Sequence, residues 1–189
     1  MMTTGLDGIR AEFERLGDPE ACECMRYVLD AEAGSSSTVF PNGNLKMDCD
    51  PNGILLPERT RPDGRGMRLA DVVAHPASRA ADLDEEDVAA LRIYSTAAFR
   101  LINDPLRDLG RVARNEPHPL PITTNLIHEA VLKLRVVSAQ SKNANVATDL
   151  YRGMRNVQMP AQFWAQGGTE MAPMSTTSDV AVAIKYAAS

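Results

Sequence analysis

The sequence predicts an α+β protein, in which a helical N-terminal part is followed by strands. Apolar residues recur at helical spacing in several segments between residues 6 and 139. A short apolar run then ends in Tyr151-Arg152-Gly153, which is typical of a strand whose last residues face a ligand. A hydroxyl cluster at residues 175–178 follows, directly before an alanine-rich run that favours a further helix.

The composition is that of an ordinary soluble globular protein. The chain has 189 residues, of which 44% are hydrophobic and 24% are charged. This length suffices for one domain, or for one domain with a helical annex. We predict an N-terminal annex with an irregular segment over residues 1–66, and the main domain over residues 67–189. The net charge of −5 argues against a nucleic-acid partner and against an anionic membrane surface.

Nothing in the sequence is typical of a membrane or secreted protein. No apolar run approaches the roughly 18 residues that a membrane span needs. Residues 1–16 carry acidic residues early and lack the apolar stretch of a signal peptide. We therefore expect a cytoplasmic protein.

Neither the cysteines nor the histidines predict a metal site. The three cysteines are an odd, sparse set, which fits a reducing compartment better than a disulfide framework. The three histidines are scattered, which favours surface or partly buried histidines over metal ligands. These residues are Cys22, Cys24, Cys49, His75, His118 and His128.

Two helices are predicted at the N-terminus, over residues 6–16 and from Pro19 to about Ala33. Gly17 and Asp18 separate them, and a proline suits the first turn of the second helix. The apolar positions of these helices recur at a spacing that places them on one core-facing side. They are Ile9, Phe13, Leu16, Met25, Val28 and Leu29.

Residues 34–66 predict a long irregular segment, because glycine, proline, asparagine and aspartate interrupt it throughout. Residues 48–53 match the opening of an EF-hand calcium loop. The closing glutamate of such a loop would fall at Arg59, whose positive charge would repel the ion. An Asx-rich turn is therefore the favoured interpretation of this stretch.

The middle of the chain predicts a short helix and then a longer one. Residues 67–74 form the short helix, which His75-Pro76 stops. Asp84 is the predicted N-cap of a helix that runs from residue 85 to about Asn103. Asp104-Pro105 ends that helix, because proline cannot continue the hydrogen-bond pattern.

A further helix is predicted to run to about Ala139, capped by Thr123 or Thr124. Its apolar residues recur at helical spacing and are expected to be buried. They are Leu126, Ile127, Ala130, Val131, Leu134 and Val137.

The C-terminal stretch carries the residues best suited to bind a ligand. Arg152 offers a planar, permanently charged fork that holds a phosphate bidentately. Gly153 has no Cβ, so its backbone can approach a flat ligand closely. The hydroxyls of Ser175, Thr176 and Thr177 can bond sugar oxygens. Ser178 or Asp179 can cap the helix that follows.

Each of these features also has a purely structural interpretation. Arg152 could be a surface arginine that pairs with Asp149 or Glu170. The hydroxyl cluster could be a plain strand-to-helix cap. Phe163-Trp164 favours a small local core under a loop over a pair that stacks on nicotinamide.

The Arg152-Gly153 pair followed by the hydroxyl cluster resembles the first two signatures of the arginine-type mono-ADP-ribosyltransferases. Residues 88–108 are similar to a conserved helix of that family, and residues 125–135 are similar to its next helix. The matching positions in the first helix are Tyr94, Ser95, Thr96, Asn103, Leu106 and Arg107. The order of these pieces is kept over residues 84–189.

The resemblance implies a fold, a cofactor and a reaction. The strands would be the first of an ADP-ribosyltransferase-type antiparallel sandwich, with NAD in a cleft between two sheets. The chain would transfer ADP-ribose from NAD to arginine side chains of an acceptor protein, with no metal. Arg152 would contact the phosphates or the adjoining ribose, and Gly153 the nicotinamide carboxamide. Ser175 would position the catalytic glutamate and the nicotinamide ribose, with Thr176 and Thr177 beside it in the cofactor site.

The sequence departs from the family in two respects. Met174 stands where the family usually has an aromatic residue, and a shift by one residue would make Thr176 the equivalent of Ser175. The third signature, a Glu-x-Glu pair, is expected beyond Ser189, so we expect residues 1–189 alone to be inactive. The alternatives are a non-catalytic NAD-binding relative or fragment, and a helical protein-interaction module.

Overall fold

The computed structural model describes residues 5–30, 54, 67–140, 144, 146–154 and 161–188, and these are mostly helical. Within these ranges no β-strand forms, and one isolated antiparallel bridge joins Tyr151 to Thr177. The predicted α+β class, with the first strands of an antiparallel sandwich, is therefore wrong for the described residues. The predicted irregular segment and calcium-like loop lie outside them, apart from Ile54.

The reason for this error lies in what surrounds the apolar run before Arg152. Val146 and Leu150 are 63% and 61% exposed, so no described layer covers them. A strand becomes stable when a sheet partner and a covering layer bury one of its faces. Here a single bridged pair stands in place of a sheet.

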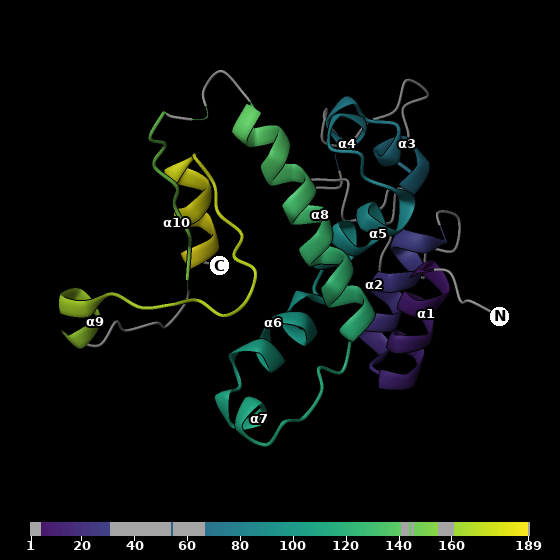
Figure 1. Ribbon diagram of the computed structural model, residues 1–189, viewed down its shortest axis with the longest axis horizontal. Coiled ribbons are helices and arrows are strands. Elements are labelled where there is room, and N and C mark those ends of the chain that lie inside the picture. The colour runs from purple at the N-terminus through teal and green to yellow at the C-terminus, as the bar shows by residue number, and fades with distance from the viewer. Residues whose placement is uncertain are drawn as a thin grey trace. The chain divides into compact units, whose positions relative to one another are not determined.

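The described residues form ten α-helices (Figure 1). They are α1 (Gly5–Leu16), α2 (Pro19–Leu29), α3 (Leu69–Val73), α4 (Pro76–Ala80), α5 (Glu85–Tyr94), α6 (Phe99–Arg107), α7 (Leu109–Ala113), α8 (Pro121–Gln140), α9 (Ala161–Gln166) and α10 (Val180–Ala188). The chain divides into two compact units, Met1–Gln140 and Ser141–Ser189. We call them the helical unit, with α1 to α8, and the C-terminal unit, with α9 and α10.

The core of the helical unit lies around α5, which packs against α1, α2, α3 and α8. The long helix α8 also packs along α1 (Figure 1). Helices α1 and α2 therefore share a core with segments on the other side of the predicted boundary at residues 66 and 67. The largest fully buried apolar side chains are Ile9, Phe13, Met25, Val28, Val88, Ile93, Ile102, Leu120 and Ile127.

The predicted helix starts at Pro19 and after Asp84 are confirmed; Asp84 is the cap that the sequence predicts, and Asp18 is a further cap. The side chain of Asp18 accepts from Ala21 N at 2.8 Å, and that of Asp84 accepts from Asp87 N at 2.9 Å. Pro76 ends the preceding helix and then occupies the first turn of α4. One predicted core position is wrong, since Val131 is 48% exposed.

The predicted helix over residues 85–103 is in fact two helices. It breaks at Thr96, whose Oγ1 donates to Ile93 O at 2.6 Å and accepts from Ala98 N at 3.1 Å. A hydroxyl that bonds the nearby backbone in this way competes with the helical pattern. The second helix, α6, continues through Pro105 to Arg107, so the predicted stop at Asp104-Pro105 is wrong. Pro105 has no N–H and therefore donates no helical hydrogen bond. The next turn is still helical, since Asp108 N donates to Asp104 O at 3.1 Å.

Helix α8 begins at Pro121, before the predicted cap at Thr123 or Thr124. Its first amides are bonded by Glu12 of α1, which is 3% exposed. Ile122 N donates to Glu12 Oε1 at 2.6 Å, and Thr123 donates to Glu12 Oε2 through N at 3.0 Å and through Oγ1 at 2.8 Å. A carboxylate is favoured there, because the first amides of a helix have no intrahelical acceptor.

A bidentate ion pair ties α1 to the end of α2. Arg10 Nη2 donates to Asp30 Oδ1 at 2.7 Å, and Nη1 donates to Oδ2 at 3.1 Å. These hydrogen bonds from Arg10 hold the pKa of Asp30 below its usual value. Because the folded pKa is lowered, the pair stabilises the fold above the unfolded pKa of about 3.9, and this contribution is lost as the pH falls through the folded pKa.

Asp30→Asn is therefore expected to lower the free energy of unfolding at pH 7 by about 0.2–1 kcal/mol, the usual range for a pair this exposed. The difference from the wild type should be smaller at pH 2, because this contribution is lost as the pH falls through the lowered pKa of Asp30. Urea unfolding followed by circular dichroism at both pH values measures it. An equal difference at the two pH values would show that the charge of Asp30 is not what stabilises this contact.

Candidate ligand site in the C-terminal unit

The C-terminal unit brings together the two segments that the sequence predicts to bind a ligand. Tyr151 N donates to Thr177 O at 2.8 Å, and Thr177 N donates to Tyr151 O at 2.9 Å. From this bridge the two segments continue with Arg152 on one and Thr176 on the other. Arg152 and Thr176 are therefore each the next residue along from a bridged position.

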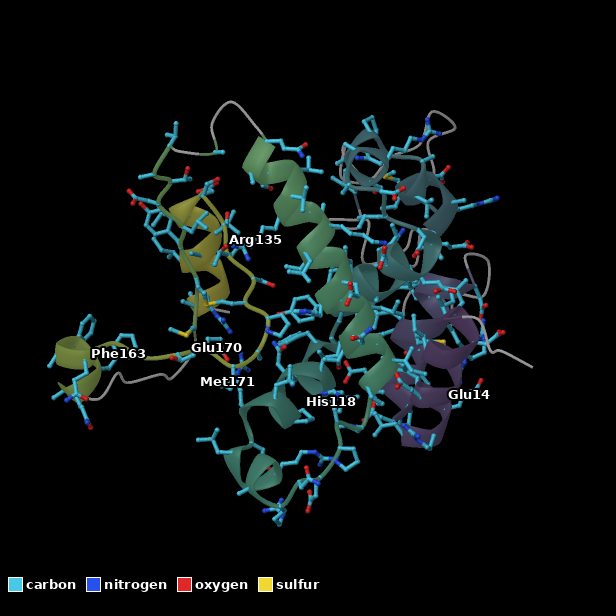
Figure 2. The ribbon with its side chains drawn as sticks, in the orientation of Figure 1. Glu14, His118, Arg135, Phe163, Glu170 and Met171 are labelled. Atoms are coloured by element: carbon cyan, nitrogen blue, oxygen red, sulfur yellow. The ribbon has the colours of Figure 1, made fainter. Side chains whose placement is uncertain are left out.

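Arg152 is held by a carboxylate of the same unit. Its Nη1 atom lies 3.7 Å from Glu170 Oε2, and the two side chains are 25% and 30% exposed. The other oxygen of that carboxylate, Oε1, accepts from Ala172 N at 3.0 Å. Figure 2 shows Glu170 and Met171 next to each other in the segment between α9 and α10. The structural interpretation of Arg152, pairing with Glu170, is therefore confirmed, and pairing leaves a role in ligand binding open.

The environment of Arg152 Nη1 is unusual for an arginine. The atom is buried, yet among the described residues no acceptor lies within hydrogen-bonding distance of it. The carboxylate at 3.7 Å attracts it electrostatically but lies beyond the range of a good hydrogen bond. A buried donor in this state favours an additional acceptor, such as a phosphate oxygen.

The hydroxyl cluster has two different parts. Thr177 Oγ1 accepts from Asp179 N at 3.1 Å, and Asp179 Oδ1 accepts from Ala181 N at 2.8 Å. Asp179 thus caps α10, which confirms the predicted helix after the cluster, and Thr177 bonds the amide of this capping residue. Ser175 and Thr176 are exposed, so their hydroxyls are accessible to a ligand.

The aromatic pair lies on α9, and the prediction that it forms a local core is wrong. Trp164 is 78% exposed and Phe163 is 36% exposed. Their rings meet edge to face with centroids 5.9 Å apart. Helix α9 spans only Ala161–Gln166, too short to bury both faces of the pair.

The helical residues that resemble the transferase family make structural contacts in the helical unit. Asn103 Nδ2 donates to the hydroxyl of Tyr94 at 3.2 Å, which joins α5 to α6. Thr96 bonds the backbone at the break between these helices. The structure therefore gives these positions a packing role, and it does not link them to a ligand.

Sequence reasoning assigned no binding role to Glu170. The sequence indicated Glu170 only as a possible ion-pair partner of Arg152. Residue spacing alone does not reveal that the bond from Ala172 N directs the carboxylate of Glu170 toward Arg152.

The part of the chain that the structure describes lacks two features. None of its helices is both long and apolar enough to cross a membrane. In the same residues, no three His, Cys, Asp or Glu side chains gather in a way that suits a metal ion. Cys22 and Cys24 are free thiols, and Cys22 Sγ donates to Phe13 O at 3.2 Å.

No protein-family model, curated protein or solved structure matches this chain. The case for a function therefore rests on the residues themselves and on the bridge between Tyr151 and Thr177.

Proposed function

We propose that the C-terminal unit binds NAD and that the protein transfers ADP-ribose from NAD to arginine side chains of an acceptor protein. The observation that carries this proposal is the bridge between Tyr151 and Thr177, which brings Arg152-Gly153 next to Ser175-Thr176. These are the two segments that the resemblance to the arginine-type transferases requires to be neighbours. The proposal does not depend on the sandwich fold.

Each residue of the proposed site has a defined task. Arg152 binds the pyrophosphate, since a guanidinium group can hold phosphate oxygens through paired N–H donors. The backbone of Gly153 bonds the carboxamide of nicotinamide, and the hydroxyls of Ser175 and Thr176 bond the ribose. Thr177 contributes to the site through its backbone pairing with Tyr151.

The proposed reaction begins with loss of nicotinamide, which leaves an oxocarbenium-like ribose. A glutamate carboxylate stabilises this charge, and the guanidinium of the acceptor then attacks it. No residue of 1–189 is assigned this role, so NAD binding is the appropriate test for these residues. The free thiols suit a reducing compartment, and the proposed acceptor is accordingly a cytoplasmic protein.

Removing one hydroxyl of the site tests the proposal in detail. Thr176→Val is expected to weaken NAD binding about fivefold, the effect of one neutral hydrogen bond worth about 1 kcal/mol. Ser178→Ala is the matched control, because Ser178 belongs to the same cluster while Asp179 caps α10. Isothermal titration calorimetry measures both affinities. No loss of affinity in Thr176→Val would remove its hydroxyl from the site, and equal losses in the two variants would show that the effect is not specific to Thr176.

A second candidate function is supported by the surface of α8. Val131, Leu132 and Val136 are 48%, 40% and 57% exposed on a helix that packs on α1 and α5 elsewhere. Exposed apolar residues that gather on one helix are typical of a protein-interaction surface. The helical unit would then bind a partner protein, and the chain would show no thermal stabilisation by NAD.

A further inference from the structure

Glu170 is the acidic residue that faces the proposed phosphate-binding arginine. Its Oε2 lies 3.7 Å from Arg152 Nη1, and its Oε1 is fixed by the amide of Ala172 at 3.0 Å. The hydrogen bond from Ala172 N restrains the carboxylate of Glu170. The carboxylate therefore stays beside Arg152 when a ligand approaches. Any anion that binds Arg152 therefore approaches a fixed negative charge as well.

We infer that Glu170 is a specificity-determining residue, which admits a diesterified pyrophosphate and disfavours a ligand that ends in a free phosphate. This inference rests on the proposed function, and it adds the chemical class of ligand that the site selects. A free terminal phosphate carries about −1.5 to −2 charges at pH 7. Each phosphate within a dinucleotide or in ADP-ribose is esterified on both sides and carries about one negative charge.

The selection follows from the charges around Arg152. The carboxylate of Glu170 beside Arg152 repels a dianionic phosphate more strongly than a singly charged one. A singly charged phosphate meets less repulsion from the carboxylate and still gains the attraction of the guanidinium. Both side chains are only about a quarter exposed, which weakens the screening of this repulsion by solvent.

The Glu170→Gln variant tests the negative charge of Glu170 alone, because glutamine keeps an oxygen that can accept from Ala172 N and removes the charge. We expect the variant to bind ADP on the order of tenfold more tightly than the wild type, and ADP-ribose only about two- to threefold more tightly. ADP and ADP-ribose are matched probes, since they differ in whether the terminal phosphate is esterified.

Calorimetric titrations with ADP, ADP-ribose and NAD are run on the wild type, Glu170→Gln, and the double variant Arg152→Ala with Glu170→Gln. Glu129→Gln on α8 is the control for a general change of one charge, because Glu129 is exposed in the helical unit. The larger gain for ADP should appear only where Arg152 is present and should be absent from Glu129→Gln.

Equal gains for ADP and ADP-ribose, or no gain for either, would overturn the inference while leaving NAD binding intact. A selective gain for ADP in a protein that never binds NAD would support the role of Glu170 and overturn the proposed function. If none of the three ligands binds the wild type or Glu170→Gln, both are wrong. Weaker binding of every ligand to Glu170→Gln would show that the carboxylate positions Arg152 for binding, which also overturns the selection.

Discussion

Replacing Arg152 by alanine is expected to lower the affinity for NAD by about a hundredfold or more. Hydrogen bonds to a charged group contribute about 1.5–3 kcal/mol each, and the guanidinium makes a pair of them with a phosphate. Arg152→Lys should recover only part of the loss, because an ammonium group cannot form the two-pronged contact. Calorimetry with NAD measures all three proteins.

The fold should tolerate both substitutions. Arg152 and Glu170 are partly exposed, and a pair of this kind contributes at most about 1 kcal/mol to stability. We therefore expect Arg152→Ala and Arg152→Lys to keep the circular dichroism spectrum of the wild type. Their midpoints of urea unfolding should change only slightly. Equal NAD affinity in the wild type and in Arg152→Ala would remove Arg152 from the site.

Replacing Glu12 by alanine is expected to lower the free energy of unfolding of the helical unit by on the order of 3 kcal/mol. The substitution leaves the buried amide and hydroxyl of Thr123, and the partly buried amide of Ile122, without the acceptor that now binds them. A buried donor that loses its partner costs about 1–3 kcal/mol, and more where the partner is charged. It also removes a negative charge from the N-terminus of α8.

Glu14→Ala is the matched control, because Glu14 lies on the same helix but is exposed (Figure 2). Its effect should stay within about 0.5 kcal/mol. Glu12→Gln should be nearly as damaging as Glu12→Ala, since one carboxylate oxygen becomes an NH₂ group that faces the donors of α8. Urea unfolding followed by helical circular dichroism measures these effects. Similar stabilities for Glu12→Ala and Glu14→Ala would mean that water replaces the carboxylate at little cost.

The sequence allowed most of the helical unit to be predicted, because its signals are local. Asp18 and Asp84 cap the helices that follow them, and Ile9 and Phe13 lie on the buried face of α1. The break at Thr96 was not predicted, because a threonine within an apolar periodic pattern gives no local sign that its hydroxyl will bond the backbone.

Contacts between distant residues were the part that could not be predicted. The sequence suggested that Thr123 or Thr124 caps α8, whereas the acceptor is Glu12, 110 residues before Ile122. In the C-terminal unit the strand prediction failed for a related reason. An apolar run indicates a strand only if something covers it, and Leu150 remains exposed. The resemblance placed Arg152 and the hydroxyl cluster in one cofactor site. The position of Glu170 beside Arg152 could not be predicted, because it depends on the turn in which Ala172 N bonds Glu170.

The dependence of α1 on later segments affects how this protein folds during synthesis. Gly5 N bonds Glu86 at 2.7 Å, and Glu12 bonds the start of α8, so these partners lie 81 to 111 residues further along the chain. At about 5–20 residues per second, a ribosome needs roughly 4–20 s to add that length. Of the described helices that pack on α1, only α2 has then been made to cover Ile9 and Phe13. We therefore expect part of the apolar surface of α1 and α2 to stay exposed on the growing chain until α5 and α8 emerge.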